Sequence, residues 1–180
     1  MISRKLTLAL CFGFVLITCG TALSAEKVPL RDANWKQVEK LIKQHQGKIV
    51  VVDIWTSTCP CCLKKFPEFV AMQKTFAGKK VVLISVNCDY DGIKTKPPKF
   101  YRPKVATFLR KHKATFQNVL LTVPFINFLE QINLGSTPAM LVYGPTGKLA
   151  RRFDNDNSKS EADDFQMKDV TLYVKKLVTK

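Results

Sequence analysis

The sequence contains little cysteine and little histidine, and its longest uncharged apolar stretch is short. Six cysteines and two histidines occur among 180 residues. Two of the cysteines, Cys11 and Cys19, fall in the N-terminal segment, and the four that remain are too few for a scaffold held together by disulfides. A chain of this length buries a core without them. No internal repeat or low-complexity tract is present, so we expect one domain preceded by a targeting segment.

Acidic side chains are also scarce. The chain has 14 Asp and Glu against 29 Lys and Arg, a formal net charge of +15. This balance favours anionic surfaces and acidic partners. The lysines are spread over every segment instead of forming one basic block, so we expect a solvated basic surface and no nucleic-acid partner. Attraction to an anionic membrane surface is the second expectation.

Residues 1–24 have the pattern of a secretory signal peptide. Arg4 and Lys5 precede an uncharged apolar stretch over 6–17, and small residues then give a cleavage site near Ser24. The stretch is shorter than the roughly 20 residues that a membrane-spanning helix needs, which favours cleavage over a retained anchor. We therefore expect an exported protein, either periplasmic or attached to the cell envelope.

Cys19 leaves a second route for processing open. Together with the preceding Leu16-Ile17-Thr18 it resembles the bacterial lipobox, in which the cysteine is lipidated and becomes the mature N-terminus. Thr18 departs from the Gly, Ala or Ser usually found at that position. Removal of Cys19 with the signal peptide and lipidation at Cys19 are therefore alternative outcomes.

The densest chemistry in the chain is the run Cys59-Pro60-Cys61-Cys62. Cys59 and Cys62 have the C-x-x-C spacing, and one helical turn brings two such sulfurs to the same end of a helix, close enough to bridge. A cysteine at a helix N-terminus faces unpaired backbone N–H groups and the positive end of the helix dipole, so it ionises readily. The pair is predicted to cycle between dithiol and disulfide.

Hydrophobic patterning places this motif between a strand and a helix. The apolar runs over 48–55 and 81–86 are typical of strands buried on both faces. The residues between them carry apolar side chains at helical spacing, with Pro67 expected to bend the helix. Two parallel strands joined by a helix make a right-handed βαβ unit.

The remaining segments are predicted from the same patterns. A polar, acidic loop is expected over 154–164, and 96–99 is expected to be neither helix nor strand. Helices are predicted over 32–46, 104–113, 125–132 and 170–178, and strands over 118–122, 139–143 and 148–153.

Two separated motifs resemble the thioredoxin-like superfamily. The run from Val51 to Cys62 resembles the thioredoxin active-site segment, and Leu63 to Pro67 continues it as in the exported TlpA/ResA-like thiol–disulfide oxidoreductases. The run from Gly135 to Tyr143 resembles the segment that holds the family's cis-proline. The resemblance implies an α/β thioredoxin fold over 27–180, with a central mixed sheet flanked by helices. It combines a βαβ unit and a C-terminal ββα unit with an N-terminal helix and an inserted loop and helix.

Three positions depart from that family. Thr58 stands where the exported branch usually has Trp, and Cys61 stands where it usually has Pro. Lys65 occupies a position where ResA-like members commonly carry a glutamate, so a role of that acid in tuning the thiols does not transfer to this chain.

The catalytic residues are predicted to be Cys59, Cys62 and Asp53. Cys59, nearest the helix end, is expected to attack a partner disulfide, and Cys62, one turn deeper, is expected to resolve the mixed disulfide. Asp53 matches the buried aspartate of cytosolic thioredoxins. Desolvation should raise its pKa, and it is expected to exchange a proton with Cys62.

Substrate contacts are predicted at Trp55, Pro60, Thr137 and Pro138. The resemblance implies a cis Thr137–Pro138 bond that packs beside the sulfurs and leaves the Thr137 backbone free to pair with an extended substrate chain. Trp55 is expected to shield the site, and a plain core tryptophan is the alternative.

Two other functions are open at this point. Cys59, Cys61 and Cys62 together are a candidate ligand set for Cu(I) or Zn(II), which would suit a soft-metal chaperone on the same fold. A thiol peroxidase related to the peroxiredoxins is disfavoured by the C-x-x-C pair. Cys61 is otherwise a neighbour filling the usual proline position, and Cys88 is expected to be a packed core thiol.

The resemblance also implies the partners. A thiol–disulfide oxidoreductase of this branch needs no cofactor beyond its redox-active disulfide and is expected to be a monomer. Its partners would be protein thiols and disulfides of the cell envelope, apocytochrome c or copper-site cysteines among them. An upstream membrane thiol–disulfide protein would supply electrons.

Overall fold

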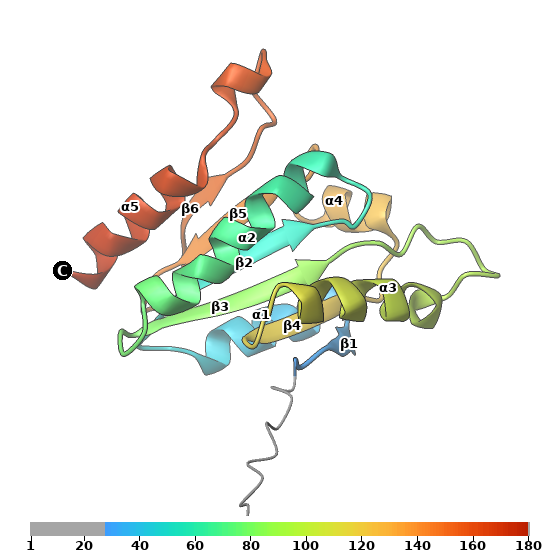
Figure 1. Cartoon of the computed structure of the whole chain (residues 1–180), viewed down its shortest axis with the longest axis horizontal. Coiled ribbons are helices and arrows are strands. Elements are labelled where there is room, and N and C mark those ends of the chain that lie inside the picture. Colours follow the sequence, from blue (N-terminus) through green and yellow to red (C-terminus); the bar gives the residue numbers. More distant parts are fainter. Residues whose placement is uncertain (1–27, 180) are drawn as a thin grey trace, which may run out of the picture.

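Six strands form one mixed sheet with helices on both faces (Figure 1). The computed structural model describes residues 28–179, so the predicted signal peptide, its cleavage site near Ser24 and Cys19 lie outside the described residues. No helix in the described part of the chain has the length and apolar character needed to cross a membrane. The elements are β1 (Arg31–Ala33), α1 (Trp35–Gln44), β2 (Ile49–Trp55), α2 (Pro60–Thr75), β3 (Val81–Asn87), α3 (Pro98–Lys111), β4 (Gln117–Leu121), α4 (Phe125–Gln131), β5 (Ala139–Tyr143), β6 (Leu149–Phe153), η1 (Glu161–Asp163) and α5 (Met167–Val178).

Strand β2 lies at the centre of the sheet, whose order is β1-β4-β3-β2-β5-β6. It runs parallel to β3 and antiparallel to β5, so that Asp53 pairs with Ser85 on one side and with Met140 on the other. All seven residues of β2 are buried, as expected for a strand covered on both faces. The central position explains why β2 and the loop after it carry the site.

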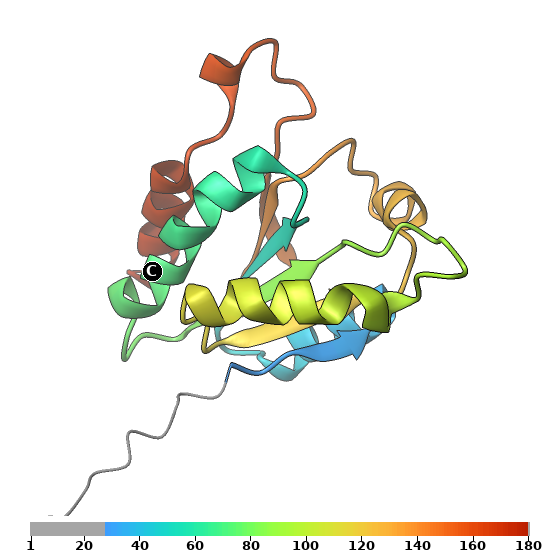
Figure 2. The same ribbon diagram turned by 45° about the vertical axis from the view of Figure 1, so that its right-hand side comes forward.

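Two apolar clusters fill the two sides of the sheet. Helices α2, α3 and α5 cover one face, and α1 and α4 cover the other, as Figure 2 shows in the turned view. Because successive side chains of a strand point to opposite faces, Val51 and Trp55 of β2 join the cluster under α2, whereas Val52 and Ile54 join the cluster over α1. The same alternation places Asp53 on the α2 face.

The observed elements match the predicted ones closely, with two exceptions. Strand β1 was not predicted, and the helix predicted over 32–46 begins only at Trp35, because a three-residue strand carries too little periodicity to be recognised. The prediction that 96–99 contains no helix was wrong, since α3 begins at Pro98. A proline is compatible with the first position of a helix, where its missing N–H would have no partner anyway. The acidic segment 154–164 is a loop, as predicted, apart from the single 3₁₀ turn of η1.

Candidate redox site

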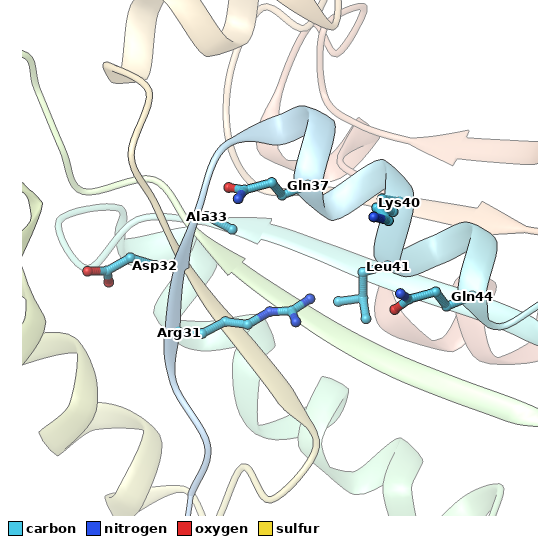
Figure 3. Close-up of a pocket in the computed structure, with 7 residues that line it drawn as sticks. All are labelled: Arg31, Asp32, Ala33, Gln37, Lys40, Leu41 and Gln44. Carbon is cyan, nitrogen blue, oxygen red and sulfur yellow. The ribbon is translucent and has the colours of Figure 1, made fainter.

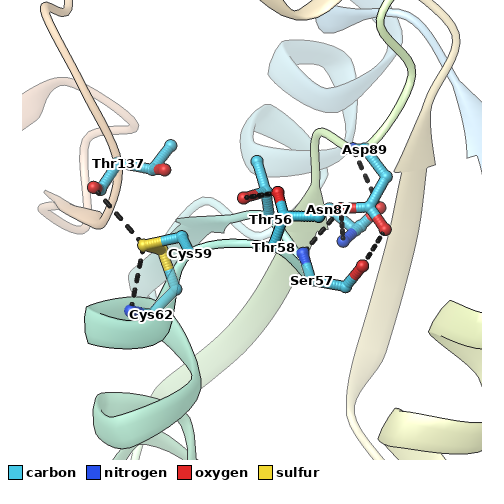
Figure 4. Close-up of a disulfide and its surroundings, with 8 residues drawn as sticks. All are labelled: Thr56, Ser57, Thr58, Cys59, Cys62, Asn87, Asp89 and Thr137. Atoms are coloured by element: carbon cyan, nitrogen blue, oxygen red, sulfur yellow. Dashed lines mark hydrogen bonds between the residues drawn. A yellow bond between two sulfur atoms is a disulfide. The ribbon is translucent and has the colours of Figure 1, made fainter.

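A disulfide joins Cys59 and Cys62 at the start of α2 (Figure 4). Their Cα atoms are 5.2 Å apart. Cys59 is the N-cap residue, and its sulfur accepts a hydrogen bond of 3.1 Å from the backbone N–H of Cys62. Pro60 occupies the first helical position, where its fixed φ favours helix initiation. A thiolate formed at this point would be stabilised by the unpaired N–H groups and the helix dipole.

The two sulfurs differ in their access to solvent. Cys59 is partly exposed, and Pro60 beside it is exposed. Cys62 is 2% exposed and packs in the apolar cluster under α2. A partner protein can therefore reach Cys59 directly and can reach Cys62 only through Cys59.

The loop before β5 approaches the disulfide from one side. The Thr137–Pro138 peptide bond is cis. The carbonyl oxygen of Thr137 lies 3.6 Å from the sulfur of Cys59, and Pro138 is buried behind it. Figure 4 shows the Thr137 carbonyl pointing at the sulfur. The structure thus brings five predicted site residues together where the central strand β2 ends: Cys59, Pro60, Cys62, Thr137 and Pro138.

A carboxylate that was not among the predicted site residues anchors the other side of the loop. Asp89, just beyond β3, accepts hydrogen bonds from the backbone N–H of Ser57 at 2.6 Å and from the Ser57 hydroxyl at 2.5 Å. Asn87 donates a third bond to it at 3.1 Å. No local sequence pattern links Asp89 to Ser57, because the contact depends on the pairing of β2 with β3.

Asp53 is buried in β2 on the face that α2 covers. Burial raises the pKa of its carboxyl group well above the ordinary value, in the direction expected from the sequence. A raised pKa means that the carboxyl group holds a proton at pH values where an exposed aspartate has lost it. This is the property required of a proton donor or acceptor for a buried thiol.

Trp55 does not contact solvent in this structure. Its indole N–H donates a hydrogen bond of 2.8 Å to the Ser85 hydroxyl, and its ring packs against Phe66 and Phe108 with centroids 5.0 and 4.9 Å away. The side chain has no exposed surface in this structure, so the substrate contact predicted for Trp55 is not formed here and stays a prediction. These surroundings are those expected of the alternative, a core tryptophan.

The other thiols have different surroundings. Cys61 is free and partly exposed, and Cys88 is free and buried. Burial, and then the nearby charges of Asp89 and Asp53, raise the pKa of Cys88 well above its usual value. Cys88 is therefore a packed core thiol, as expected.

No group of three His, Cys, Asp or Glu side chains within residues 28–179 is arranged to hold a metal ion. The predicted alternative set was Cys59, Cys61 and Cys62. Two of its sulfurs are bonded to each other here, so the three-thiolate ligand set is not formed in this structure.

Lys65 lies in α2, one turn beyond Cys62. It is only 9% exposed, and its ammonium group sits 5.2 Å from the centre of the Phe165 ring. This cation–π contact, with the aliphatic stem packed in the cluster, explains how a charge is tolerated where the related family carries an acid.

A surface pocket lies away from the disulfide and is lined by no cysteine. It has a volume of about 240 Å³ and lies between β1 and α1, at the edge of the sheet farthest from β6 (Figure 3). Strands β4 and β3 separate it from β2. It is lined by Arg31, Asp32, Ala33, Gln37, Lys40, Leu41 and Gln44. None of these side chains is a thiol.

Comparison with known proteins assigns the chain to a family. The model of the AhpC/TSA family matches residues 23–168. The chain belongs to the AhpC/TSA family. This confirms the thioredoxin-like superfamily that the two motifs predicted, and the structure contains the Cys59–Cys62 disulfide.

Solved structures with similar folds include several thiol–disulfide enzymes. A thiol-disulfide isomerase from Corynebacterium glutamicum superposes with a TM-score of 0.56 at 15% identity, over 75% of this chain and 83% of that one. A thiol-disulfide oxidoreductase from Bacteroides fragilis gives 0.55 at 18% identity, over 73% and 82%. A secreted disulfide oxidoreductase from Mycobacterium tuberculosis gives 0.51 at 18%, over 74% and 85%. At these identities the likeness establishes the thioredoxin fold.

The sequence of a human protein is also similar to part of this chain. NHL repeat-containing protein 2 is 26% identical over 123 residues, which cover 64% of this chain. The match spans only 15% of that much longer protein. It therefore relates this chain to one part of the human protein and carries no statement about the rest.

Proposed function

We propose that this protein is an exported thiol–disulfide oxidoreductase that exchanges disulfides with proteins of the cell envelope through Cys59 and Cys62. The observation that carries the proposal is the position of the Cys59 sulfur, which is accessible, caps α2 and is bonded to a buried partner one turn away. A sulfur at a helix N-terminus is favoured as a thiolate, and the thiolate is the species that attacks a disulfide.

The exchange has two steps. The Cys59 thiolate attacks one sulfur of the substrate disulfide, the substrate S–S bond breaks, and the other substrate sulfur leaves as a thiolate. The Cys62 thiolate then attacks the Cys59 sulfur and releases the second substrate sulfur. The substrate gains two electrons and the Cys59–Cys62 pair loses them. Because every step is reversible, the net direction depends on the reduction potential of the Cys59–Cys62 pair relative to that of the substrate disulfide.

Asp53 would assist the second step. Cys62 is buried, so its thiol cannot give its proton directly to water. A carboxylate on the same side of the sheet is a suitable acceptor, and the raised pKa of Asp53 favours its holding that proton. In the reverse direction, Asp53 would return the proton to the Cys62 thiolate.

The loop of Thr137 and Pro138 would hold the substrate. The Thr137 backbone lies against Cys59, and an extended substrate chain bonded to Cys59 can pair with it as an added strand. Pro60, exposed beside Cys59, would contact the same chain. These contacts need no particular substrate sequence, which suits an enzyme with several clients.

Export is supported by the signal-peptide pattern of residues 1–24 and by the likeness of the fold to a secreted disulfide oxidoreductase. We infer clients with exposed cysteines in the envelope, an upstream membrane thiol–disulfide protein as electron donor, and an association of the basic surface with anionic lipid. Mass spectrometry of the mature protein after expression in a bacterium tests the export. An N-terminus near Ala25 supports cleavage, a lipidated Cys19 supports the lipoprotein route, and an uncleaved Met1 contradicts both.

Reduction of insulin by dithiothreitol tests the activity. We expect the protein to accelerate it and Cys59→Ser to remove the acceleration. The same preparation, fully reduced, should be titrated with Cu(I) and Zn(II) and assayed with hydrogen peroxide. Tight metal binding or peroxide turnover without disulfide exchange would replace the proposed function by the metal chaperone or the peroxidase.

A further inference from the structure

A pocket of about 320 Å³ lies beside the loop that carries Cys59. It is lined by Thr56, Ser57, Thr58, Cys88, Asp89, Asp91, Phe100, Tyr101, Lys104 and Phe125. Thr58 immediately precedes Cys59 in the chain. We call this cavity the α3 pocket, because Phe100, Tyr101 and Lys104 belong to α3.

The α3 pocket and the Thr137 loop flank Cys59 on opposite sides. Thr137 precedes β5 and Asp89 follows β3, and these two strands lie on either side of β2 in the sheet. Figure 4 shows the same arrangement, with Thr137 and Asp89 on opposite sides of Thr58. A substrate chain that is bonded to Cys59 and extends away from Thr137 would pass over Thr58 toward the pocket. An extended chain advances by about 3.3–3.6 Å per residue, so the pocket lies within reach of a few substrate residues.

The walls of the α3 pocket are tied together without a substrate. The bonds from Ser57 to Asp89 fix the wall next to the disulfide. The backbone N–H of Phe125 donates to the carbonyl of Tyr90 at 2.7 Å, which fixes the start of α4 against the segment after β3. A Cβ atom at Gly92 would lie 3.2 Å from that of Pro124, so the same two segments also meet closely there. Binding of a side chain in the pocket therefore costs little conformational entropy, because the pocket walls are already ordered.

Exposed apolar side chains gather on the segments around this pocket. Five large hydrophobic residues are strongly exposed within the part of the chain that the structure describes, and three belong to these segments: Ile93 at 44%, Phe100 at 58% and Ile126 at 60%. Phe100 lines the pocket itself, while Ile93 and Ile126 neighbour the contact between Gly92 and Pro124. Grouped apolar exposure of this kind marks a surface that binds another molecule.

The charge of the same surface is positive. Lys94 and Lys96 are exposed on the segment leading into α3, Lys99 is exposed in its first turn, and Lys104 lines the pocket. The two carboxylates there are already engaged, since Asp89 accepts from Ser57 and Asp91 accepts from the backbone N–H of Ile93 at 3.0 Å. Both carboxylates keep their charge, but the four lysines outnumber them, so the surface carries a net positive charge and favours carboxylates on a partner.

We propose that the α3 pocket binds a large apolar side chain from an extended segment of the client protein, with acidic residues beside it. This rests on the proposed function, because the client is held in place by its sulfur on Cys59. The pocket would give the enzyme a preference among cysteine-containing segments that the backbone contacts at Thr137 cannot provide. Partly unfolded chains carry such apolar residues exposed, whereas folded proteins bury them.

A set of model peptides tests the proposal. Each is a disulfide-linked peptide with a fluorescent reporter, in which one Phe is moved from one to four residues away from the cysteine on either side, and each has an Ala counterpart. Single-turnover reduction by the pre-reduced full-length protein gives the rate constant. We expect one position at which the Phe peptide reacts about tenfold faster than its Ala counterpart, as is usual for one large apolar group in a pocket.

Two variants locate the preference. Phe100→Ala should reduce the rate on the best Phe peptide to that on its Ala counterpart. Two further peptides carry Glu or Lys beside the best Phe, and the wild type should react faster with the Glu peptide. Lys104→Glu should reverse that order. The matched control is Leu172→Ala, which truncates a similarly exposed side chain (54%) on α5 and should keep both preferences.

The outcomes separate the two proposals. Exchange that depends on Cys59 but shows no preference for any Phe position overturns the pocket assignment and leaves the proposed function intact. The assignment is also overturned if Phe100→Ala keeps the preference for Phe over Ala and Lys104→Glu keeps the preference for Glu over Lys. Absence of any Cys59-dependent exchange overturns the proposed function and the pocket assignment together.

Discussion

Cys62 and Cys88 are almost equally buried, with 2% and 1% of their surfaces exposed, yet their chemistry differs. They also lie on neighbouring parts of the fold, because the backbone N–H of Cys88 donates to the carbonyl of Trp55, at the end of the strand that leads to Cys59. Cys62 is bonded to Cys59. Cys88 is a free thiol that donates a hydrogen bond of 3.7 Å to the carbonyl oxygen of Val86, and its pKa is raised by burial and then by nearby carboxylates.

The difference comes from the charges that each sulfur meets. Cys62 stands in the first turn of α2, where unpaired N–H groups and the helix dipole favour a negative sulfur. At Cys88, burial in an apolar cluster disfavours a negative sulfur most, and the carboxylates of Asp89 and Asp53 add to this effect. Burial alone therefore does not decide whether a cysteine reacts.

The largest expected effect contrasts the Cys59–Cys62 pair with the free thiol of Cys88. Cys59→Ser should lower the rate of disulfide exchange to that of the uncatalysed reaction, because no other accessible sulfur caps the helix. Cys88→Ala should leave the rate within about twofold, since the thiol stays protonated and out of reach. Insulin reduction under dithiothreitol measures both, and an equal loss in the two variants would contradict the distinction.

A smaller effect is expected from removing the buried carboxyl group. The raised pKa of Asp53 means that the folded state binds its proton more tightly than the unfolded chain does, so stability is lost as the pH rises from the unfolded pKa through the folded one. Asp53→Asn should therefore gain stability over the wild type at pH 8 and gain little near pH 3.5. Urea unfolding at the two pH values measures this.

The same Asp53→Asn variant should also lose one ionisation from the pH profile of the resolving step. Rapid mixing with a substrate forms the mixed disulfide, and the rate constant of its resolution is then measured against pH for the wild type and the variant. Identical profiles would leave Asp53 with an effect on stability and no part in proton transfer.

The anchor of the active-site loop is expected to matter less for chemistry than for stability. Asp89→Ala removes the acceptor for both Ser57 bonds, and we expect a loss of about 1–3 kcal/mol in the free energy of unfolding. It should also lower the pKa of Cys88, because the negative charge that raises this pKa more than Asp53 does is removed. Urea unfolding and thiol alkylation against pH measure the two effects, with the exposed Glu130→Gln as control. An unchanged alkylation profile would show that the carboxylate does not govern Cys88.

The smallest effect is expected at the third cysteine of the motif. Cys61 is free while Cys59 and Cys62 are bonded, so Cys61→Ser should change the exchange rate by less than about twofold. The variant should likewise show the Cys59–Cys62 disulfide by peptide mapping. A collapse of activity would instead make Cys61 a resolving thiol and would change the comparison above.

Local sequence patterns were enough to predict the elements that carry the site. The apolar run of β2, the C-x-x-C spacing and the helical periodicity of α2 are local features, and each survived in the structure. Local patterns did not predict features that depend on distant residues, and the approach of Thr137 to Cys59 was expected only from the family resemblance. The pairing of Asp89 with Ser57 spans 32 residues, and the start of α3 at Pro98 was hidden by two adjacent prolines that normally interrupt helices.

What the sequence determined by itself was a reactive pair of cysteines between a buried strand and a helix, because spacing and hydrophobic period are set by neighbouring residues. Only the tertiary structure decided which groups surround that pair. It placed Thr137 on one side and Asp89 on the other, withdrew Trp55 into the core, and built a pocket from α3 and the start of α4. The physical reason is that strand order in the sheet, which brings these segments to one edge, is fixed by packing over the whole domain.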